Sequence, residues 1–167
     1  MESVEKHTVF PQNPTNEVKS TERRQKLMLA GEFRHNLDAK NRLFIPAKHR
    51  EALGEVFMVA KSFRDACLKV YSMEEWNAFI TPMRSMTGKE KDKIFRALHR
   101  DSAEVTPDAQ GRIVIPAALV AHAGIEKGAV VVGCGDYAEI WSDANYEAMV
   151  NDEDLDGIRD LLESYGL

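Results

Sequence analysis

Five basic side chains follow one another closely in the first third of the chain. Each guanidinium or ammonium group is positively charged and donates several hydrogen bonds, which is the chemistry that binds phosphate and other anions. The cysteines and histidines, in contrast, lack the paired spacing of a metal site. We therefore expect a binding protein that is not an enzyme and holds no cofactor or metal. The candidate anion-binding residues are Arg34, Lys40, Arg42, Lys48 and Arg50.

The basic segment contains a ten-residue phrase that returns 70 positions later. Residues 38–47 and 108–117 are identical at six of the ten positions. The same offset matches residues 70–72 with 140–142, and Trp76 with Tyr146. A repeat of this length predicts two copies of one folding unit, each of about 45 residues.

Each phrase opens with a tight turn. Asp38 or Asp108 can accept hydrogen bonds from its own chain two residues on, and Gly111 allows a positive φ. In the first copy Asn41 takes the place of this glycine, and asparagine tolerates the left-handed region better than most residues. The turns lead into short apolar strands, which end at Pro46 and Pro116; a proline there suits the first turn of a helix.

Arg42 and Arg112 occupy the same place in the two phrases, and two interpretations are open for both. The arginine can bond the carboxylate that opens its turn, or it can bind phosphate. Basic residues surround the first phrase, whereas Arg112 stands alone around the second. We therefore expect phosphate binding by Arg42 and a structural role for Arg112.

The rest of each copy predicts a β-hairpin and a helix. Residues 56–71 and 129–141 contain paired β-branched and aromatic runs divided by polar turns. Ser72 and Glu75 have the spacing of a capping box, which begins a helix. One such unit cannot cover its own apolar faces, so we expect the two copies to interleave around a shared core with an approximate twofold axis. The predicted class is α+β, mostly β.

The repeated Asp-x-x-(Gly/Asn)-Arg-x-x-x-Pro phrase, the lead-in at residues 31–37 and the segment at residues 71–76 resemble the MraZ family of bacterial transcriptional regulators. That family is built from two SpoVT-AbrB type domains, and the resemblance covers residues 29–150. It implies a double swapped-hairpin barrel, AbrB-like, formed within one chain and carrying short peripheral helices. It also implies a ring-shaped homo-oligomer that binds direct repeats in double-stranded promoter DNA. The expected targets are the regulator's own promoter and the division and cell wall gene cluster, under repression.

The resemblance and the elements together predict the domain organisation. Residues 1–28 are polar and are expected to be a disordered extension, either preceding a true start at Met28 or acting as a basic arm. Residues 32–77 and 102–146 form the two SpoVT-AbrB repeats. Residues 78–101 form a connecting helix between them, and residues 147–167 form an acidic C-terminal helix.

Charge is divided unequally along the chain. The total is −5, but residues 1–100 carry +6 and residues 101–167 carry −11. Such asymmetry favours one face that meets nucleic acid. We therefore expect the first copy to touch DNA and the second to complete the fold. With no apolar stretch of membrane length, we expect a cytoplasmic, nucleoid-associated protein without a small-molecule substrate.

Two other functions remain open at this point. One is an antitoxin-type binding module of the MazE kind, which shares the barrel and uses a tail to bind a toxin. The other is a ring-forming structural protein without DNA binding. Asn41 and the acidic total leave the structural protein open, whereas the presence of both copies in one chain and the short tail weigh against the antitoxin.

Overall fold

The computed structural model describes residues 26–167, so all but the last three residues of the expected N-terminal extension lie outside the described residues. The described part has an α+β fold that is mostly sheet, with six short helices. The first copy contributes β1 (Glu32–Asn36), β2 (Arg42–Phe44), α1 (Ala47–Leu53), β3 (Phe57–Lys61), β4 (Cys67–Ser72) and α2 (Met73–Arg84). The second contributes β5 (Ser102–Val105), β6 (Arg112–Val114), α4 (Ala117–Ala123), β7 (Gly128–Gly133), β8 (Tyr137–Ser142) and α5 (Asp143–Asn151). The remaining helices are α3 (Gly88–Arg100), between the copies, and α6 (Leu155–Ser164), after them.

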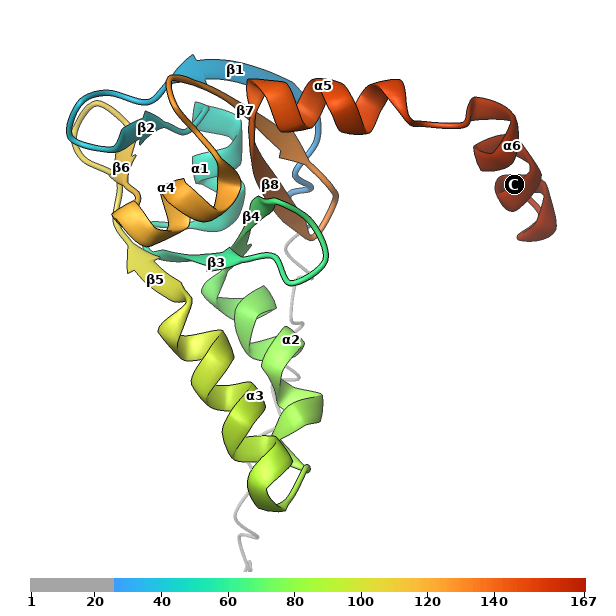
Figure 1. Ribbon diagram of the computed structural model, residues 1–167, viewed down its shortest axis with the longest axis horizontal. Helices are drawn as coiled ribbons and strands as arrows, with labels where there is room; N and C mark the ends of the chain where they lie inside the picture. Colours follow the sequence, from blue (N-terminus) through green and yellow to red (C-terminus); the bar gives the residue numbers. More distant parts are fainter. Residues whose placement is uncertain (1–25) are drawn as a thin grey trace, which may run out of the picture.

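The strands of the two copies are intermixed in one antiparallel sheet of order β1-β7-β8-β4-β3-β5. Exchanging every strand for its counterpart in the other copy returns the same order read backwards, which is the mark of an approximate twofold axis. The axis passes between β4 and β8, where Lys69 lies opposite Glu139. The copies therefore interleave, as the sequence predicts, and neither has a complete sheet of its own (Figure 1).

A separate two-stranded ribbon, β2 with β6, lies over one face of the sheet. Leu43 faces Ile113 at its centre, and the ribbon is extended by Ile45 N–H to Gly111 O and Ile115 N–H to Asn41 O, at 2.9 and 2.8 Å. The ribbon and the sheet share no ladder, so the expected swapped-hairpin barrel is not closed by hydrogen bonds. One reason is local: the prolines that follow Ile45 and Ile115 have no N–H to continue the pairing.

Apolar side chains fill both faces of the sheet. The main core lies between the sheet and a layer made of the ribbon, α1 and α4. On the opposite face α2 and α3 cover one end of the sheet, where Trp76 of α2 packs against it, and α5 covers the other end, over Trp141 of β8. Cys67 is buried under α5, and this burial raises the pKa of its thiol to about 12. Cys134 is exposed in the turn after β7.

The helices begin where the sequence predicts, but two segments that were each expected to hold one helix contain parts of two. The Ser72 hydroxyl accepts a hydrogen bond from the Glu75 N–H at 3.1 Å, and Ser142 does the same for Asn145. The single helix expected over residues 78–101 is instead the end of α2 followed by α3, and residues 147–167 hold the end of α5 and all of α6. None of the helices within residues 26–167 is long and apolar enough to cross a membrane.

Candidate nucleic-acid interface

The turn between β1 and β2 is built around the carboxylate of Asp38. One oxygen accepts the backbone N–H groups of Lys40 and Arg42, both at 2.9 Å, and the other accepts Nε–H of Arg42 at 2.6 Å. The Arg42 backbone N–H, followed by its guanidinium, therefore holds the pKa of Asp38 below its usual value. Because the carboxylate is satisfied within the turn, it offers little negative charge to a ligand outside.

The turn between β5 and β6 repeats this geometry. Asp108 accepts the N–H groups of Gln110 and Arg112 at 2.9 and 3.0 Å, and Nε–H of Arg112 at 2.9 Å. The side chains of Arg42 and Arg112 are 30% and 29% exposed. The two arginines therefore have the same structural role and the same access to solvent, and their geometry does not separate a phosphate ligand from a turn brace.

The difference between Asn41 and Gly111 has a steric explanation. Both have positive φ, 55° and 79°. A Cβ on Gly111 would lie 2.8 Å from Cζ of Arg50, so the guanidinium would have to move aside for a side chain there. The repeat offset assigns Val120 to the place of Arg50 in the other copy. Valine is smaller and has no guanidinium that would reach the first turn, which is consistent with a residue that carries a side chain, Asn41, in that turn.

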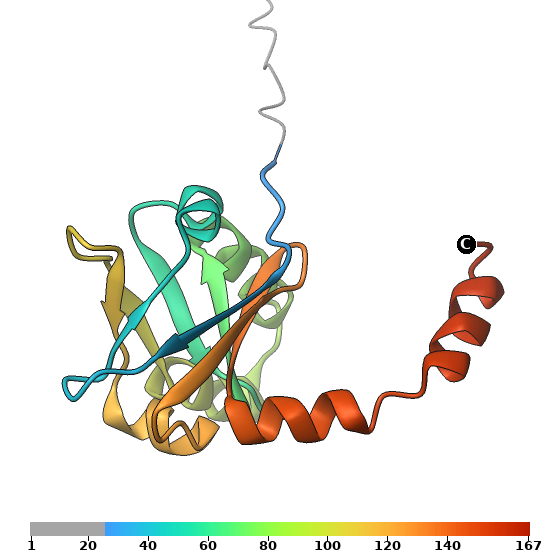
Figure 2. The ribbon, with the colours of Figure 1, turned by 90° about the horizontal axis from the view of Figure 1, so that it is seen from above.

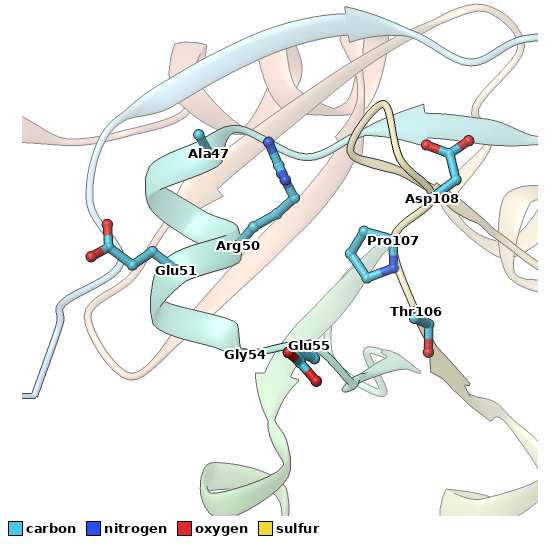
Figure 3. A pocket seen from close by; sticks show the side chains of 8 residues that line it. All are labelled: Ala47, Arg50, Glu51, Gly54, Glu55, Thr106, Pro107 and Asp108. Carbon is cyan, nitrogen blue, oxygen red and sulfur yellow. The ribbon is translucent and has the colours of Figure 1, made fainter.

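Interleaving carries the basic helix α1 of the first copy to the turn of the second. The Nε–H of Arg50 donates to Ile45 O at 3.0 Å, and its Cζ lies 5.9 Å from the ring centre of Phe44. Figure 3 shows Arg50 between α1 and the loop carrying Pro107 and Asp108, beside a hollow of about 650 Å³. Basic residues of copy one therefore lie near both turns, and the expectation that the first copy touches DNA stays a prediction.

Lys40 and Lys48 are exposed, one at the tip of the first turn and one on α1. Their counterparts in the other copy are the uncharged Gln110 and Ala118. Both turns project from the same side of the molecule, opposite α5 and α6 (Figures 1 and 2). The ribbon thus has a cationic turn at each end, with different basic residues at the two ends.

Comparison with known proteins identifies the family. Residues 28–96 and 98–158 each match the family described as "MraZ protein, putative antitoxin-like". The chain belongs to the MraZ family. Its relatives include proteins named transcriptional regulator MraZ from Ligilactobacillus salivarius, 40% identical over 84% of this chain and 100% of that protein, and from Acetivibrio thermocellus, 40% identical over 77% and 90%. A third, from a Thermoanaerobacter species, is 42% identical, also over 77% and 90%.

Arg34 is the candidate that lies apart from the turns in this MraZ chain. Its Nε–H donates to Glu32 at 3.0 Å, and Nη1 lies 3.5 Å from Asp143 and 3.9 Å from Glu147. Its Cζ is 5.6 Å from the ring centre of Tyr146, whose hydroxyl donates to Glu32. Three carboxylates therefore compensate the charge of Arg34.

Sequence reasoning missed two arrangements in this MraZ chain. Arg50 approaches the turn that holds Arg112, and Arg34 is paired with the acidic start of α5. The first arrangement had a usable signal in the sequence. The turn that faces Arg50 has Gly111, whereas the turn of the other copy, where Val120 takes the place of Arg50, has Asn41. The second had none, because Arg34 and Asp143 are more than one hundred positions apart and unrelated by the repeat.

Proposed function

We propose that this chain is a sequence-specific DNA-binding transcriptional regulator. The name printed for its relatives, transcriptional regulator, supports the regulatory part. The observation that carries the DNA-binding part is the pair of cationic turns on one side of a chain whose total charge is negative. By its resemblance to the family, the proposal extends to repression of the chain's own promoter and of the division and cell wall cluster, and to association with the nucleoid.

The proposed contact set follows the ribbon. One end offers Lys40 and Arg42, and the other offers Lys48, Arg50 and Arg112. Phosphate contacts from such groups supply most of the affinity for a duplex and make it fall with salt. Arg34 is left out because it lies apart from both turns, next to the acidic residues Glu32, Asp143 and Glu147. The acidic helices α5 and α6 lie on the opposite side (Figure 2), so they oppose binding only weakly at physiological ionic strength.

The unequal ends of the ribbon support recognition of direct repeats. A symmetric dimer reads an inverted repeat because its twofold axis coincides with that of the site. Here the axis is only approximate, with Lys40 at one turn and Gln110 at the other, so a protomer binds in one orientation. Protomers in the same orientation around a ring match repeats in the same direction. Linked sites could raise affinity by about 10² to 10⁴ over one protomer.

The decisive experiment compares two substitutions that break the same ion pair. Arg42→Ala removes the cation, whereas Asp38→Asn keeps it and leaves an oxygen for the turn's N–H groups. The probe is a fluorescein-labelled duplex carrying the DNA upstream of the gene, measured by anisotropy between about 50 and 200 mM salt. Arg96→Ala, on the exposed part of α3, is the control for loss of an unrelated cation.

The expected outcome is at least tenfold weaker binding for Arg42→Ala, with Asp38→Asn and Arg96→Ala close to the parent. If Arg42→Ala and Asp38→Asn weaken binding equally, Arg42 acts only by bracing the turn. If the parent binds no better than to an unrelated duplex at any salt, the regulator proposal fails.

A second function is favoured by the antitoxin-like wording of the family description. An antitoxin-type module would bind a protein partner through a segment outside the ribbon. The ribbon variants separate the two functions, because they would leave such a protein contact intact while removing DNA binding.

A further inference from the structure

Helix α6 has an apolar side that nothing in the described part of the chain covers. Leu155 is 69% exposed and Leu161 is 62% exposed, and Ile158 and Leu162 share their side of the helix. A helix of ten residues is marginal in water without tertiary packing. Asp154 caps its start by accepting the Asp156 N–H at 3.2 Å, but a single cap does not replace packing. The sequence of α6 is therefore that of a helix made to pack against a partner.

A second uncovered apolar surface lies on the helical hairpin at the far end of the molecule. A groove of about 620 Å³ runs between α2 and α3. Phe63, which is 58% exposed, and Phe79 stand at its wall, above the buried cluster that contains Trp76. Its apolar lining is completed by Met83, Ile94, Ala97 and Leu98.

We propose that α6 of one copy docks into the α2–α3 groove of another copy of this chain. Charge complementarity selects this occupant. Helix α3 carries three more basic than acidic residues over its whole length; Lys93 and Glu90 both line the groove itself. The segment 152–163 carries six acidic residues and only Arg159 as a basic one. An amphipathic helix that lays an apolar side into an apolar groove, with opposite charges at the rim, is a recurring mode of recognition.

The geometry favours docking between copies over docking within one. Residues 152–154 alone connect α5 to α6, and three residues reach only about 10 Å. Figures 1 and 2 show α6 on the side of the molecule opposite the ribbon's turns and well away from the end of the α2–α3 hairpin. Helix and groove are different surfaces, so the contact is heterologous and propagates from copy to copy until a ring closes. This inference deepens the proposed function by naming the contact that holds the oligomer together.

The test uses the full chain and two single variants. Ile158→Asp damages the helix side and leaves the groove intact, and Phe63→Asp does the reverse. Each alone should weaken self-association about tenfold or more, because a buried apolar side chain is replaced by a charge. Val114→Glu, which adds a charge at an exposed apolar position on the ribbon, is the matched control and should keep the parent's mass.

The decisive step is to mix the two damaged variants and measure mass by sedimentation or light scattering. One intact helix and one intact groove remain in the mixture, so a species of two chains, and no larger one, is expected. If the mixture stays monomeric while both variants fold by circular dichroism, or if both retain the parent's mass, the proposal is wrong. A helix docked in its own chain would give the second of these results, because neither variant would then change a contact between copies.

Failure here is distinguishable from failure of the DNA proposal. The Ile158→Asp variant keeps the ribbon, so at low salt it should still bind the labelled promoter duplex, with the affinity of a single protomer. Loss of assembly without loss of this weaker binding supports both proposals. An intact assembly that binds no DNA would overturn only the regulator proposal.

Discussion

Lys69 and Glu139 occupy the same position in the two copies and pair with each other across the approximate twofold axis, 3.3 Å from Nζ to Oε1. A dimer of identical units would place two like charges at this point. The joining of both copies in one chain allows them to differ, and here they differ in sign. Tyr137 adds to the pairing, since the Lys69 Nζ lies 4.1 Å from its ring centre. Burial alone would lower the pKa of Lys69, but Tyr137 and Glu139 raise it above its ordinary value.

Reversing one of these charges should destabilise the protein. Lys69→Glu puts two carboxylates together on the sheet, and we expect a loss of about 2 kcal/mol or more in the free energy of unfolding, measured with urea. The swap Lys69→Glu with Glu139→Lys should recover part of it. Recovery cannot be complete, because Glu139 also accepts the Trp141 indole N–H at 2.9 Å. A swap no better than the single variant would show that the pairing contributes nothing.

The contact between Gly111 and Arg50 predicts a coupled pair of substitutions. Gly111→Ala should cost about 1–2 kcal/mol through the positive φ alone, plus the cost of moving the guanidinium aside. In the Arg50→Ala background only the φ cost remains, so the double variant should be more stable than the sum of the two single effects indicates. Additive free energies of unfolding would contradict this, and Asn41→Gly, at the turn without an opposing arginine, is the control.

The turn carboxylates predict how stability depends on acid. The backbone N–H groups of Arg42 and Arg112, followed by their guanidinium groups, hold the pKa values of Asp38 and Asp108 below normal. Their contribution is therefore complete above the unfolded value of about 4 and is lost as pH falls through the lower folded values. The combined Asp38→Asn and Asp108→Asn variant should lose part of this acid dependence. Urea midpoints at several pH values test it, and parallel curves for parent and variant would exclude the two turns as its source.

The residue at each turn tip predicts a change in salt dependence. Lys40→Gln gives the first turn the residue of the second, and removing one cation that binds phosphate should reduce the slope of log K against log salt by about 0.9. Gln110→Lys adds a cation at the other turn and should steepen the slope. Anisotropy titrations with the promoter duplex measure both. An unchanged slope in Lys40→Gln would mean that this ammonium group binds no phosphate.

Much of the fold could be predicted because it repeats in the chain. The offset of 70 gave two equivalent sets of strands, and the capping box of Ser72 and Glu75 predicted the start of α2. Interleaving followed from the lack of a self-sufficient core in one copy. The sequence did not predict that the ribbon and the sheet would stay unpaired. That depends on where two prolines, which have no N–H to donate, lie in the folded molecule.

The site was predicted less completely, for a related reason. The sequence shows which copy a basic residue belongs to, but it does not show which turn the residue lies near. In the structure, helix α1 of the first copy lies beside the turn of the second copy. Basic residues surround Arg42 in the sequence and not Arg112, but the two arginines make the same hydrogen bonds to the aspartates of their turns. Phe63 and Phe79 line an open groove, which only the arrangement of α2 and α3 in the folded molecule shows.

The pairing of β1 with β7 also determines when this molecule can fold during its own synthesis. Glu32 pairs with Val132, 100 positions further on, so the edge strand leaves the ribosome long before its neighbour is translated. Contacts so distant in sequence form slowly, since a long loop must close first. Until then the apolar residues of β3 and β4 have no lasting cover, and a message truncated between the repeats encodes half of a sheet rather than a small domain.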